Sequence, residues 1–430
     1  MNSMVKNASW IIAGKIAQAA LSFVVSLMTA RYLGPSNYGL LNYATSLVIF
    51  VTPIMTLGLT GTLVQEFINH PEDEGKILGT SLLSCFATSI LCMFGVIGFS
   101  LIANPNEPTT VIVCALYSLL LLVQAFEISQ YWFQAKLLSK YTSMVSLFAY
   151  VVISAYKIYL LWTGKSIYWF AVSYALDYLI IAIGQLYFYK KLGGGKLVFS
   201  FKTFKELFDR SRHYILSNMM ITVFTQTGNI LLTLLLDESA TGFFSAATVC
   251  SGITTFVFAA IIDSFRPAIF QSKMVSEEAF ELNIKRLYSI VIYLALAQCI
   301  GMTVLSAFII KLTYGADYSP AVPVLQIVVW QMLFSYLGQI RNIWILAEEK
   351  QKYLWILNAA AAVANVVLNF ILIPLLGVCG AAISAVVTQC FANVIMSWVV
   401  RPIAHNNRLL FQSLNPKILK DMVFNIILHR

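Results

Sequence analysis

Charged residues are scarce in this chain of 430 residues: they make up only 11% of it, whereas hydrophobic residues make up 59%. A water-soluble protein of this size needs far more polar surface, so the composition excludes a soluble globular protein. Histidine is also rare, and His70, His213, His405 and His429 are scattered without the spacing of a metal site. The sequence lacks a GxxxxGK[ST] phosphate-binding loop, so no ATP site is expected. We expect no enzyme activity and no cofactor beyond H⁺ or Na⁺ as a coupling ion.

Cysteine is used sparingly too, and its placement excludes a disulfide framework or a zinc site. Six of the seven cysteines lie within apolar runs, and Cys379 lies in a short turn. A cleavable signal peptide is not evident, because the first apolar stretch has no short core followed by a cleavage site. It runs on to Ala30-Arg-Tyr-Leu-Gly-Pro35, which is typical of the end of a membrane-spanning helix.

Long apolar runs dominate what is present. A helix that crosses a hydrocarbon core of about 30 Å needs roughly 20 apolar residues. Twelve such runs are predicted, at about 8–31, 38–61, 78–103, 109–133, 141–162, 166–189, 214–236, 241–265, 288–312, 321–345, 353–375 and 378–400. The alternating pattern of a membrane barrel is absent. The predicted fold is an all-α integral membrane protein, with about 12 transmembrane helices in two six-helix bundles around a central cavity.

Positive charge fixes the expected orientation. With the amino terminus in the cytoplasm, outside connectors hold only Arg31, Lys165 and Lys311, and Lys15 and Lys157 lie within spans. All other lysines and arginines are then cytoplasmic, as the positive-inside rule requires. We therefore expect a multi-pass protein of the bacterial cytoplasmic (inner) membrane with both termini inside. The net charge of +9 reflects this topology and contact with anionic lipid, not nucleic-acid binding.

The longest polar connector divides the chain into two halves. The predicted segments are an N-terminal six-helix bundle (1–189), a flexible, basic cytoplasmic linker (190–213), a C-terminal six-helix bundle (214–400) and an amphipathic cytoplasmic tail (401–430). Within the second bundle, a short amphipathic helix is expected at 266–287.

The halves share a weak repeat. Leu33-Gly-Pro-Ser-Asn-Tyr-Gly39 follows the first span, and Leu236-Asp-Glu-Ser-Ala-Thr-Gly242 follows the seventh, 203 residues later. Six spans separate the copies, so both run in the same direction, which predicts parallel repeats about an axis along the membrane normal. Chance recurrence of small and turn residues at helix ends is the alternative.

Ionisable residues inside the membrane cost at least about 2.5–3.5 kcal/mol each and therefore need a partner or a hydrated cavity. Lys15 and Asp177 lie at depths that differ by only about 4 Å, so the two side chains are able to pair. One interpretation is a cavity cation for an anionic substrate beside a carboxylate that takes up an ion. The alternatives are a structural ion pair, or snorkelling of Lys15, and also of Lys157, to the membrane surface.

Other polar groups extend this set. Asp263 and Arg266 lie at i, i+3 and either pair or form a gate; the polar cluster Thr225–Asn229 lies at the middle of the seventh span. Asn365 and Asn369 are assigned to helix packing, and aromatics such as Tyr131, Trp132, Trp162, Tyr168 and Trp169 mostly to interface belts. The candidate substrate-binding residues are Lys15, Arg31, Lys157, Gln226, Asn229, Arg266 and Arg341. The candidate ion-coupling residues are Asp177, Asp263 and Glu127.

Several motifs resemble a known family. They are Ala30–Gly39, the segment Tyr131-Trp-Phe-Gln-Ala135 with Lys140-Tyr141, the segment Thr241–Ala247, and Asn365, Asn369 and Pro374 followed by Gly377-Val-Cys-Gly380. In order and spacing they resemble the bacterial polysaccharide flippases, the Wzx-like O-antigen and capsule repeat-unit transporters of the multidrug/oligosaccharidyl-lipid/polysaccharide exporter superfamily. The resemblance covers about 10–400.

The resemblance implies two six-helix bundles, alternating access, and movement of an undecaprenyl-diphosphate-linked oligosaccharide from the inner to the outer leaflet. Lys15, Arg31 and Lys157 match basic positions of that family. Asn229 stands where many relatives carry an acidic residue, so the resemblance does not imply ion coupling on this helix.

Three functions are therefore compared. The leading one is lipid-linked oligosaccharide flipping for O-antigen, capsule or exopolysaccharide, with membrane lipids and a polysaccharide polymerase or chain-length regulator as partners. The second is a cation-coupled multidrug exporter, for which an acidic, aromatic cavity is expected. The third, a membrane polysaccharide polymerase or ligase, requires a large outside loop, and no outside loop exceeds about a dozen residues.

Overall fold

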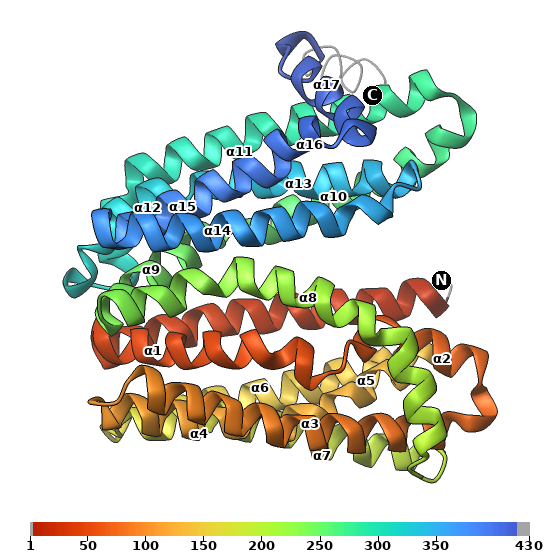
Figure 1. Cartoon of the computed structure of the whole chain (residues 1–430), viewed down its shortest axis with the longest axis vertical. Coiled ribbons are helices and arrows are strands. Elements are labelled where there is room, and N and C mark those ends of the chain that lie inside the picture. Colours follow the sequence, from red (N-terminus) through yellow and green to blue (C-terminus); the bar gives the residue numbers. More distant parts are fainter. Residues whose placement is uncertain (1–2, 419–430) are drawn as a thin grey trace. The chain divides into compact units, whose positions relative to one another are not determined.

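The computed structural model describes the backbone of residues 3–418 and the side chains of residues 21–418. Every regular element in this range is a helix, which confirms the all-α fold class. The chain divides into two compact units, Met1–Gly242 and Phe243–Arg430, called unit 1 and unit 2 below. Each unit is a layered bundle of long helices (Figure 1).

Unit 1 is built around α1, which packs on α6, α8 and α4, while α7 packs on α4 and α6. Three 3₁₀ turns, at Leu59–Gly61, Pro71–Asp73 and Ala125–Ser129, connect its helices. The helices of unit 1 are α1 Ser3–Met55, α2 Leu63–Asn69, α3 Glu74–Ala103, α4 Pro108–Gln124, α5 Gln130–Ala135, α6 Ser139–Trp162, α7 Ile167–Lys191 and α8 Phe201–Leu235.

Unit 2 is built around α11, which packs on α10, α12 and α13, while α15 packs on α12, α13 and α14. Helix α9, Glu238–Ser251, begins in unit 1 and continues into unit 2. The other helices are α10 Thr255–Val275, α11 Glu277–Thr313, α12 Ala321–Val328, α13 Trp330–Ala347, α14 Leu354–Leu376, α15 Val378–Cys390, α16 Met396–Val399 and α17 Ala404–Gln412. Short turns lie at Ala316–Tyr318, Gln351–Tyr353 and Arg401–Ile403, and a π-helix at Phe391–Ile395.

The expected spans correspond to helices. Ten helices in the described range are long and apolar enough to cross a membrane, or eleven if the bent pair α9–α10 is counted as one span. The predicted span 8–31 and most of the predicted span 38–61 lie within α1, which ends at Met55 and is interrupted at Gly34, where the backbone has φ 71° and ψ 173°. The predicted eighth span is broken: α9 and α10 meet at an angle of 43°. The segment at 266–287 is not a separate helix, because α10 runs on to Val275 and α11 begins at Glu277.

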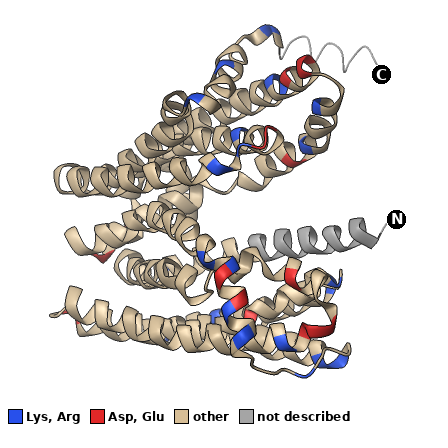
Figure 2. Ribbon diagram, turned by 45° about the vertical axis from the view of Figure 1, so that its right-hand side comes forward, with Lys and Arg blue, Asp and Glu red and all other residues tan. Residues whose placement is uncertain are grey.

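In each unit taken by itself, the charged residues gather at one end of the helices (Figure 2). In unit 2 this end contains Glu348, just after α13, whose carboxylate forms ion pairs with Lys273 and Lys350. Burial alone raises the pKa of Glu348, but hydrogen bonds from the two lysines and their charges lower it below its ordinary value. This cluster fastens the end of α10 to the end of α13.

The connector between α7 and α8 is held against unit 1, which differs from the flexible linker expected for 190–213. Residues 194–200 form an extended strap. The Val198 amide donates to the Gly75 carbonyl (3.3 Å), and the Ser200 amide donates to Thr80 Oγ1 (3.0 Å). A Cβ at Gly75 would overlap the Lys196 carbonyl, so the strap lies directly on the first turn of α3. From Phe201 on, the remaining linker residues are already helical and continue into α8.

Glu74 holds the strap. Its carboxylate accepts hydrogen bonds from Trp132 Nε1 (3.0 Å) and the Gly195 amide (3.3 Å), and forms an ion pair with Lys136 (2.8 Å). Its side chain is 14% exposed. One carboxylate therefore joins the strap, the start of α3 and the end of α5.

We expect Glu74→Ala to lower the free energy of unfolding by about 1–3 kcal/mol, because the indole and ammonium donors lose their shared acceptor. Thermal unfolding of the purified protein in detergent measures this loss. Glu72→Ala is the matched control, since the Glu72 side chain is 69% exposed. Equal unfolding temperatures for the two variants would contradict the role assigned to Glu74.

By its contacts, all of α8 belongs to unit 1. Arg210 pairs with the buried carboxylate of Glu66 (2.6 Å), and Ser211 Oγ donates to the Leu57 carbonyl (2.9 Å). The sequence placed residues 214–235 of this helix in the second bundle, and that assignment stays a prediction. In the tail, α17 packs on α11, and Asn406 Nδ2 donates to the hydroxyl of Tyr288 (3.0 Å).

Candidate functional site

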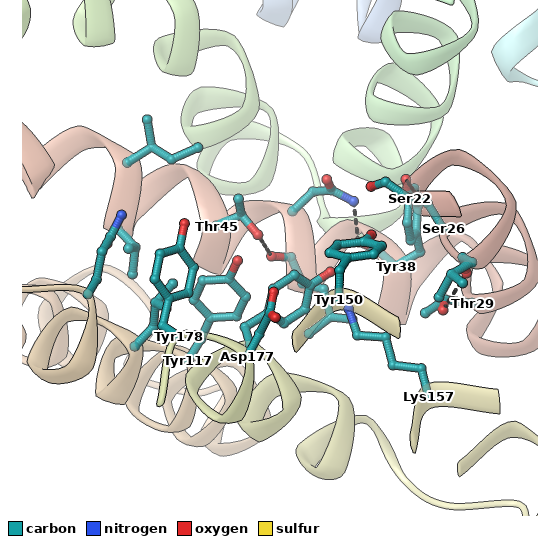
Figure 3. A pocket seen from close by; sticks show the side chains of 18 of the residues that line it. Ser22, Ser26, Thr29, Tyr38, Thr45, Tyr117, Tyr150, Lys157, Asp177 and Tyr178 are labelled. Atoms are coloured by element: carbon teal, nitrogen blue, oxygen red, sulfur yellow. Dashed lines mark hydrogen bonds between the residues drawn. The ribbon is translucent and has the colours of Figure 1, made fainter. Parts of the chain in front are cut away.

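A cavity of about 330 Å³ lies inside unit 1, lined by residues of α1, α4, α6 and α7 (Figure 3). Small-molecule pockets have volumes of roughly 300–1,000 Å³, so this cavity is large enough for a ligand group. Its lining is mainly hydroxyl, amide and aromatic. The polar and aromatic lining residues are Ser22, Ser26, Thr29, Tyr38, Asn42, Thr45, Thr52, Tyr117, Gln124, Tyr150, Lys157, Tyr174, Asp177 and Tyr178.

Helical spacing brings these side chains to one face of each helix. Tyr174, Asp177 and Tyr178 lie at i, i+3 and i+4 on α7, and therefore point the same way. Tyr150 and Lys157 are two turns apart on α6, as are Tyr117 and Gln124 on α4. The cavity thus exists because three amphipathic stripes converge on the polar face of α1.

Lys157 is the buried cation of this cavity. Its side chain is only 8% exposed. The ammonium lies 3.8 Å from the centroid of the Tyr174 ring, a cation–π contact that partly replaces lost hydration. Among the described residues it forms no ion pair within 4.0 Å. Of the two alternatives for Lys157, snorkelling and cavity lining, the structure favours cavity lining, since the side chain lies inside the bundle and lines the cavity (Figure 3).

Two residues that line this cavity each carry a buried side-chain oxygen that has no hydrogen-bond partner among the described residues. These oxygens are Asp177 Oδ1 and Gln124 Oε1, both completely buried. A buried acceptor without a donor is costly and needs an explanation. Hydroxyl groups of a sugar, a bound cation, a proton or water would each satisfy them.

A second cavity of about 130 Å³ adjoins the first, because Thr52 and Gln124 line both. Glu127 and Tyr131 line this smaller space. Glu127 lies in the 3₁₀ turn that links α4 to α5, one turn after Gln124. The two carboxylates predicted for ion coupling in the first half, Asp177 and Glu127, therefore line adjoining cavities that meet at Gln124.

Comparison with known proteins identifies the family. The sequence model of the family described as "Polysaccharide biosynthesis protein" matches residues 4–273, which is more than half of the chain. The chain belongs to this family.

Relatives extend the match over nearly the whole chain. A Shigella flexneri protein named "Putative O-antigen transporter" is 22% identical over 418 residues, covering 92% of this chain and 97% of the relative. The "Capsular polysaccharide biosynthesis protein CapF" of Staphylococcus aureus is 21% identical over 401 residues, covering 90% and 97%. Together with the structures below, they confirm the resemblance to Wzx-like flippases.

Solved structures share the fold. The lipid II flippase MurJ in an inward closed conformation superposes with a TM-score of 0.71 at 15% identity, covering 97% of this chain and 93% of that chain. A multidrug resistance MATE family transporter in an inward-facing conformation gives a TM-score of 0.66 at 14% identity, covering 91% and 96%. This chain therefore shares its fold with the flippase MurJ and with the MATE transporter.

The remaining candidates of unit 1 are dispersed. Lys15 lies in α1, but its side chain is outside the described residues, so the predicted pairing with Asp177 stays a prediction. Arg31 is exposed and does not line the cavity. On α8, Asn229 Nδ2 donates to Ser46 Oγ on α1 (3.0 Å), whereas Gln226 contacts its neighbour Thr225 (3.2 Å).

Unit 2 holds the other three candidates. Asp263 and Arg266 form an ion pair at 2.8 Å, with side chains 63% and 48% exposed. The predicted pairing is therefore confirmed; a gate role stays a prediction. Arg341 is buried and donates to the Ala392 carbonyl (2.8 Å) in the π-helix and to Asn342 Oδ1 (3.1 Å). Arg341 therefore stabilises the π-helix by a hydrogen bond to its backbone. A role of Arg341 in substrate binding stays a prediction.

Sequence reasoning missed the tyrosines. Tyr117, Tyr150, Tyr174 and Tyr178 line the cavity, and the rings of Tyr117 and Tyr174 lie 4.8 Å apart. Of the interface aromatics named from the sequence, Trp132 is fully packed in the core. The available signal was the i, i+3, i+4 spacing of two tyrosines around Asp177, an intramembrane carboxylate.

Proposed function

We propose that this protein is a flippase that moves undecaprenyl-diphosphate-linked oligosaccharide repeat units from the inner to the outer leaflet of the cytoplasmic membrane. The observation that carries the proposal is the cavity of unit 1: a buried, unpaired Lys157 among tyrosines and hydroxyls. A diphosphate needs a cation, and sugar rings pack on aromatic faces while their hydroxyls bond to Asp177 and Gln124.

The energetics favour a phosphorylated headgroup. Hydrogen bonds to charged groups contribute about 1.5–3 kcal/mol each, and a buried ammonium with no carboxylate within 4.0 Å among the described residues has already lost most of its hydration. The lipid tail needs no site, because it stays in the bilayer. Lys15, Arg31, Arg266 and Arg341 are the further cations, and Gln226 and Asn229 the further polar groups, that the proposal assigns to the headgroup path.

Ion coupling is assigned to the carboxylates. In this proposal Asp177 takes up H⁺ or Na⁺, and Glu127 in the adjoining cavity supplies it from the cytoplasmic side; Asp263 serves in the second half. The buried Oδ1 of Asp177 without a donor supports this assignment. Both termini are placed in the cytoplasm, which the gathering of charge at one end of each unit supports (Figure 2).

A cation-coupled multidrug exporter is the second candidate, since MATE transporters share the fold. A buried lysine in the cavity disfavours cationic drugs, because like charges repel in a medium of low dielectric constant. The relatives are named for polysaccharide transport or biosynthesis, which favours the first candidate over both the drug exporter and a polymerase. A polymerase and a chain-length regulator remain predicted partners.

Reconstitution tests the function. Purified protein is placed in vesicles with a fluorescent oligosaccharide on a lipid diphosphate, and a membrane-impermeant enzyme that cleaves the sugar is added outside. The fraction cleaved is expected to rise with time only when the protein is present. The same sugar on a neutral lipid is expected to move much more slowly. Equal rates for both lipids, or no protein-dependent movement, would refute the proposal.

A Lys15→Ala variant gives a cellular counterpart. We expect it to block surface polysaccharide at normal protein abundance, because the headgroup path loses a cation. Polymer is measured by immunoblot and abundance by a tag. Normal polymer output would remove Lys15 from the path without affecting the assignment of Lys157.

A further inference from the structure

The two copies of the 203-residue repeat contact each other. In copy one, Pro35 begins the second part of α1 directly after the break at Gly34; in copy two, Glu238 begins α9. Gly39 and Gly242 are the fifth residues of these helical segments. Both copies belong to unit 1, where the start of α9 adjoins α8 and α1 (Figure 1).

The contact is reciprocal. A Cβ on Gly39 would overlap the carbonyl oxygen of Glu238 and lie 2.7 Å from the Gly242 nitrogen. A Cβ on Gly242 would overlap the carbonyl oxygen of Pro35 and lie 3.3 Å from the Gly39 nitrogen. The first and fifth residues of one copy thus meet the fifth and first residues of the other, which is the pattern of a two-fold axis.

A hydrogen bond is repeated as well. The hydroxyls of Tyr38 and Ser26 lie 3.2 Å apart, and Thr241 Oγ1 donates to the Asn229 carbonyl at 3.1 Å. Both members of the second pair follow those of the first by 203 residues. Each copy therefore fixes its short helix to the preceding span at the same point, which makes chance recurrence of small residues an inadequate explanation for the repeat.

We propose that the contact of Pro35 and Gly39 with Glu238 and Gly242, called the glycine crossing below, is the outer gate of the transporter. It seals the outer ends of the first and seventh spans, and it separates when the headgroup leaves towards the outer leaflet. The inference rests on the proposed function for its cargo, and on the predicted topology, which places residues 32–37 outside.

The chemistry of the contact suits a gate. Small residues let two helices approach closely within a membrane, and the crossing at Gly39 and Gly242 brings backbone atoms together with no side chain between them. One side-chain bond secures it: Thr110 Oγ1 on α4 donates to Glu238 Oε1 (2.9 Å). Closure is thus set by shape and by this one hydrogen bond, and opening requires the loss of both.

Outside labelling tests the gate. A single cysteine replaces Thr29, which lines the cavity, in a version without the seven native cysteines, and cells are treated with a membrane-impermeant maleimide. Gly39→Ala and Gly242→Ala are each expected to raise the labelling rate roughly tenfold, because the added methyl group prevents closure. The two-fold relation predicts similar increases at both positions. Oligosaccharide transport is expected to fall in both.

Gly95→Ala is the matched control, because a Cβ at this helical glycine of α3 meets nothing within 4 Å. Thr110→Val is the second variant: it adds no clash but removes the bond to Glu238, and is expected to raise labelling several-fold. If the alanine variants fail to fold, the labelling rate of Thr110→Val tests the gate in their place.

Unchanged labelling in folded Gly39→Ala and Gly242→Ala, or in Thr110→Val if these do not fold, would overturn the gate. The labelling is carried out in cells that do not synthesise the oligosaccharide. A negative transport assay with the expected labelling would therefore contradict the proposed cargo and leave the gate standing.

Discussion

Replacing Lys157 with methionine is expected to reduce the transport of a lipid-diphosphate oligosaccharide by about 10- to 100-fold, because one charge-assisted interaction of about 1.5–3 kcal/mol is lost. Methionine has a similar length and packs on the Tyr174 ring. Removing an unpaired buried charge is not expected to destabilise the fold, since its desolvation cost disappears with it. The vesicle assay measures transport, and thermal unfolding measures stability.

Lys165→Met is the matched control. Lys165 lies in the connector after α6, where its side chain is exposed, so the same chemical change is expected to leave transport within about twofold of the wild type. A Lys157→Met protein that is stable and transports normally would show that the ammonium does not contact the phosphates. A drug-export phenotype that strengthens in this variant would favour the second candidate function.

The fold was predictable because membrane insertion leaves little choice. Backbone groups in hydrocarbon must bond within their own helix, so each run of about 20 apolar residues becomes a span. The elements that differed lie where this rule is weak. Gly34 bends the chain without a polar loop, and the amphipathic residues 201–213 extend α8 because they pack on the loops of unit 1.

The site was only partly predictable, because sequence gives the depth of a residue in the membrane but not the direction it faces. Rarity of charge singled out Lys157 and Asp177, and both line the cavity of unit 1. Depth alone suggested Lys15 as the partner of Asp177, which stays a prediction, but depth did not show that Lys157 lines the same cavity as Asp177. Five tyrosines from four helices converge there, and no local pattern shows such convergence between distant segments.

A second repeat in the sequence was overlooked. Trp132-x-x-Ala-x-x-x-x-Lys-Tyr141 recurs as Trp344-x-x-Ala-x-x-x-x-Lys-Tyr353, displaced by 212 residues. Each helix ends alike: Leu137 and Glu349 have φ of 56° and 55°. The next amide in each copy donates to the carbonyl five residues earlier, from Leu138 at 2.7 Å and from Lys350 at 2.9 Å. This ending, a positive-φ C-terminal cap, supports duplication of the halves independently of the glycine repeat.

The prediction with the second large effect concerns Asp177. Asp177→Asn is expected to make transport insensitive to the collapse of the ion gradient, because an uncharged amide binds neither H⁺ nor Na⁺. One elementary charge moved through a potential of about 100 mV supplies about 2.3 kcal/mol, or roughly a 40-fold driving force. Vesicle transport with and without an ionophore measures this difference. Substrate affinity is expected to change little, since an amide still accepts hydrogen bonds from sugar hydroxyls.

Asp263→Asn provides the comparison, because the same change is made on a carboxylate that is 63% exposed and already paired with Arg266. If Asp263→Asn alone abolishes the response to the ionophore, the ion that drives transport binds in unit 2. Asp177 Oδ1 then accepts a hydrogen bond from the sugar instead of binding the ion. If Asp177→Asn and Glu127→Gln each abolish it, the adjoining cavities that meet at Gln124 form one ion path that includes both carboxylates.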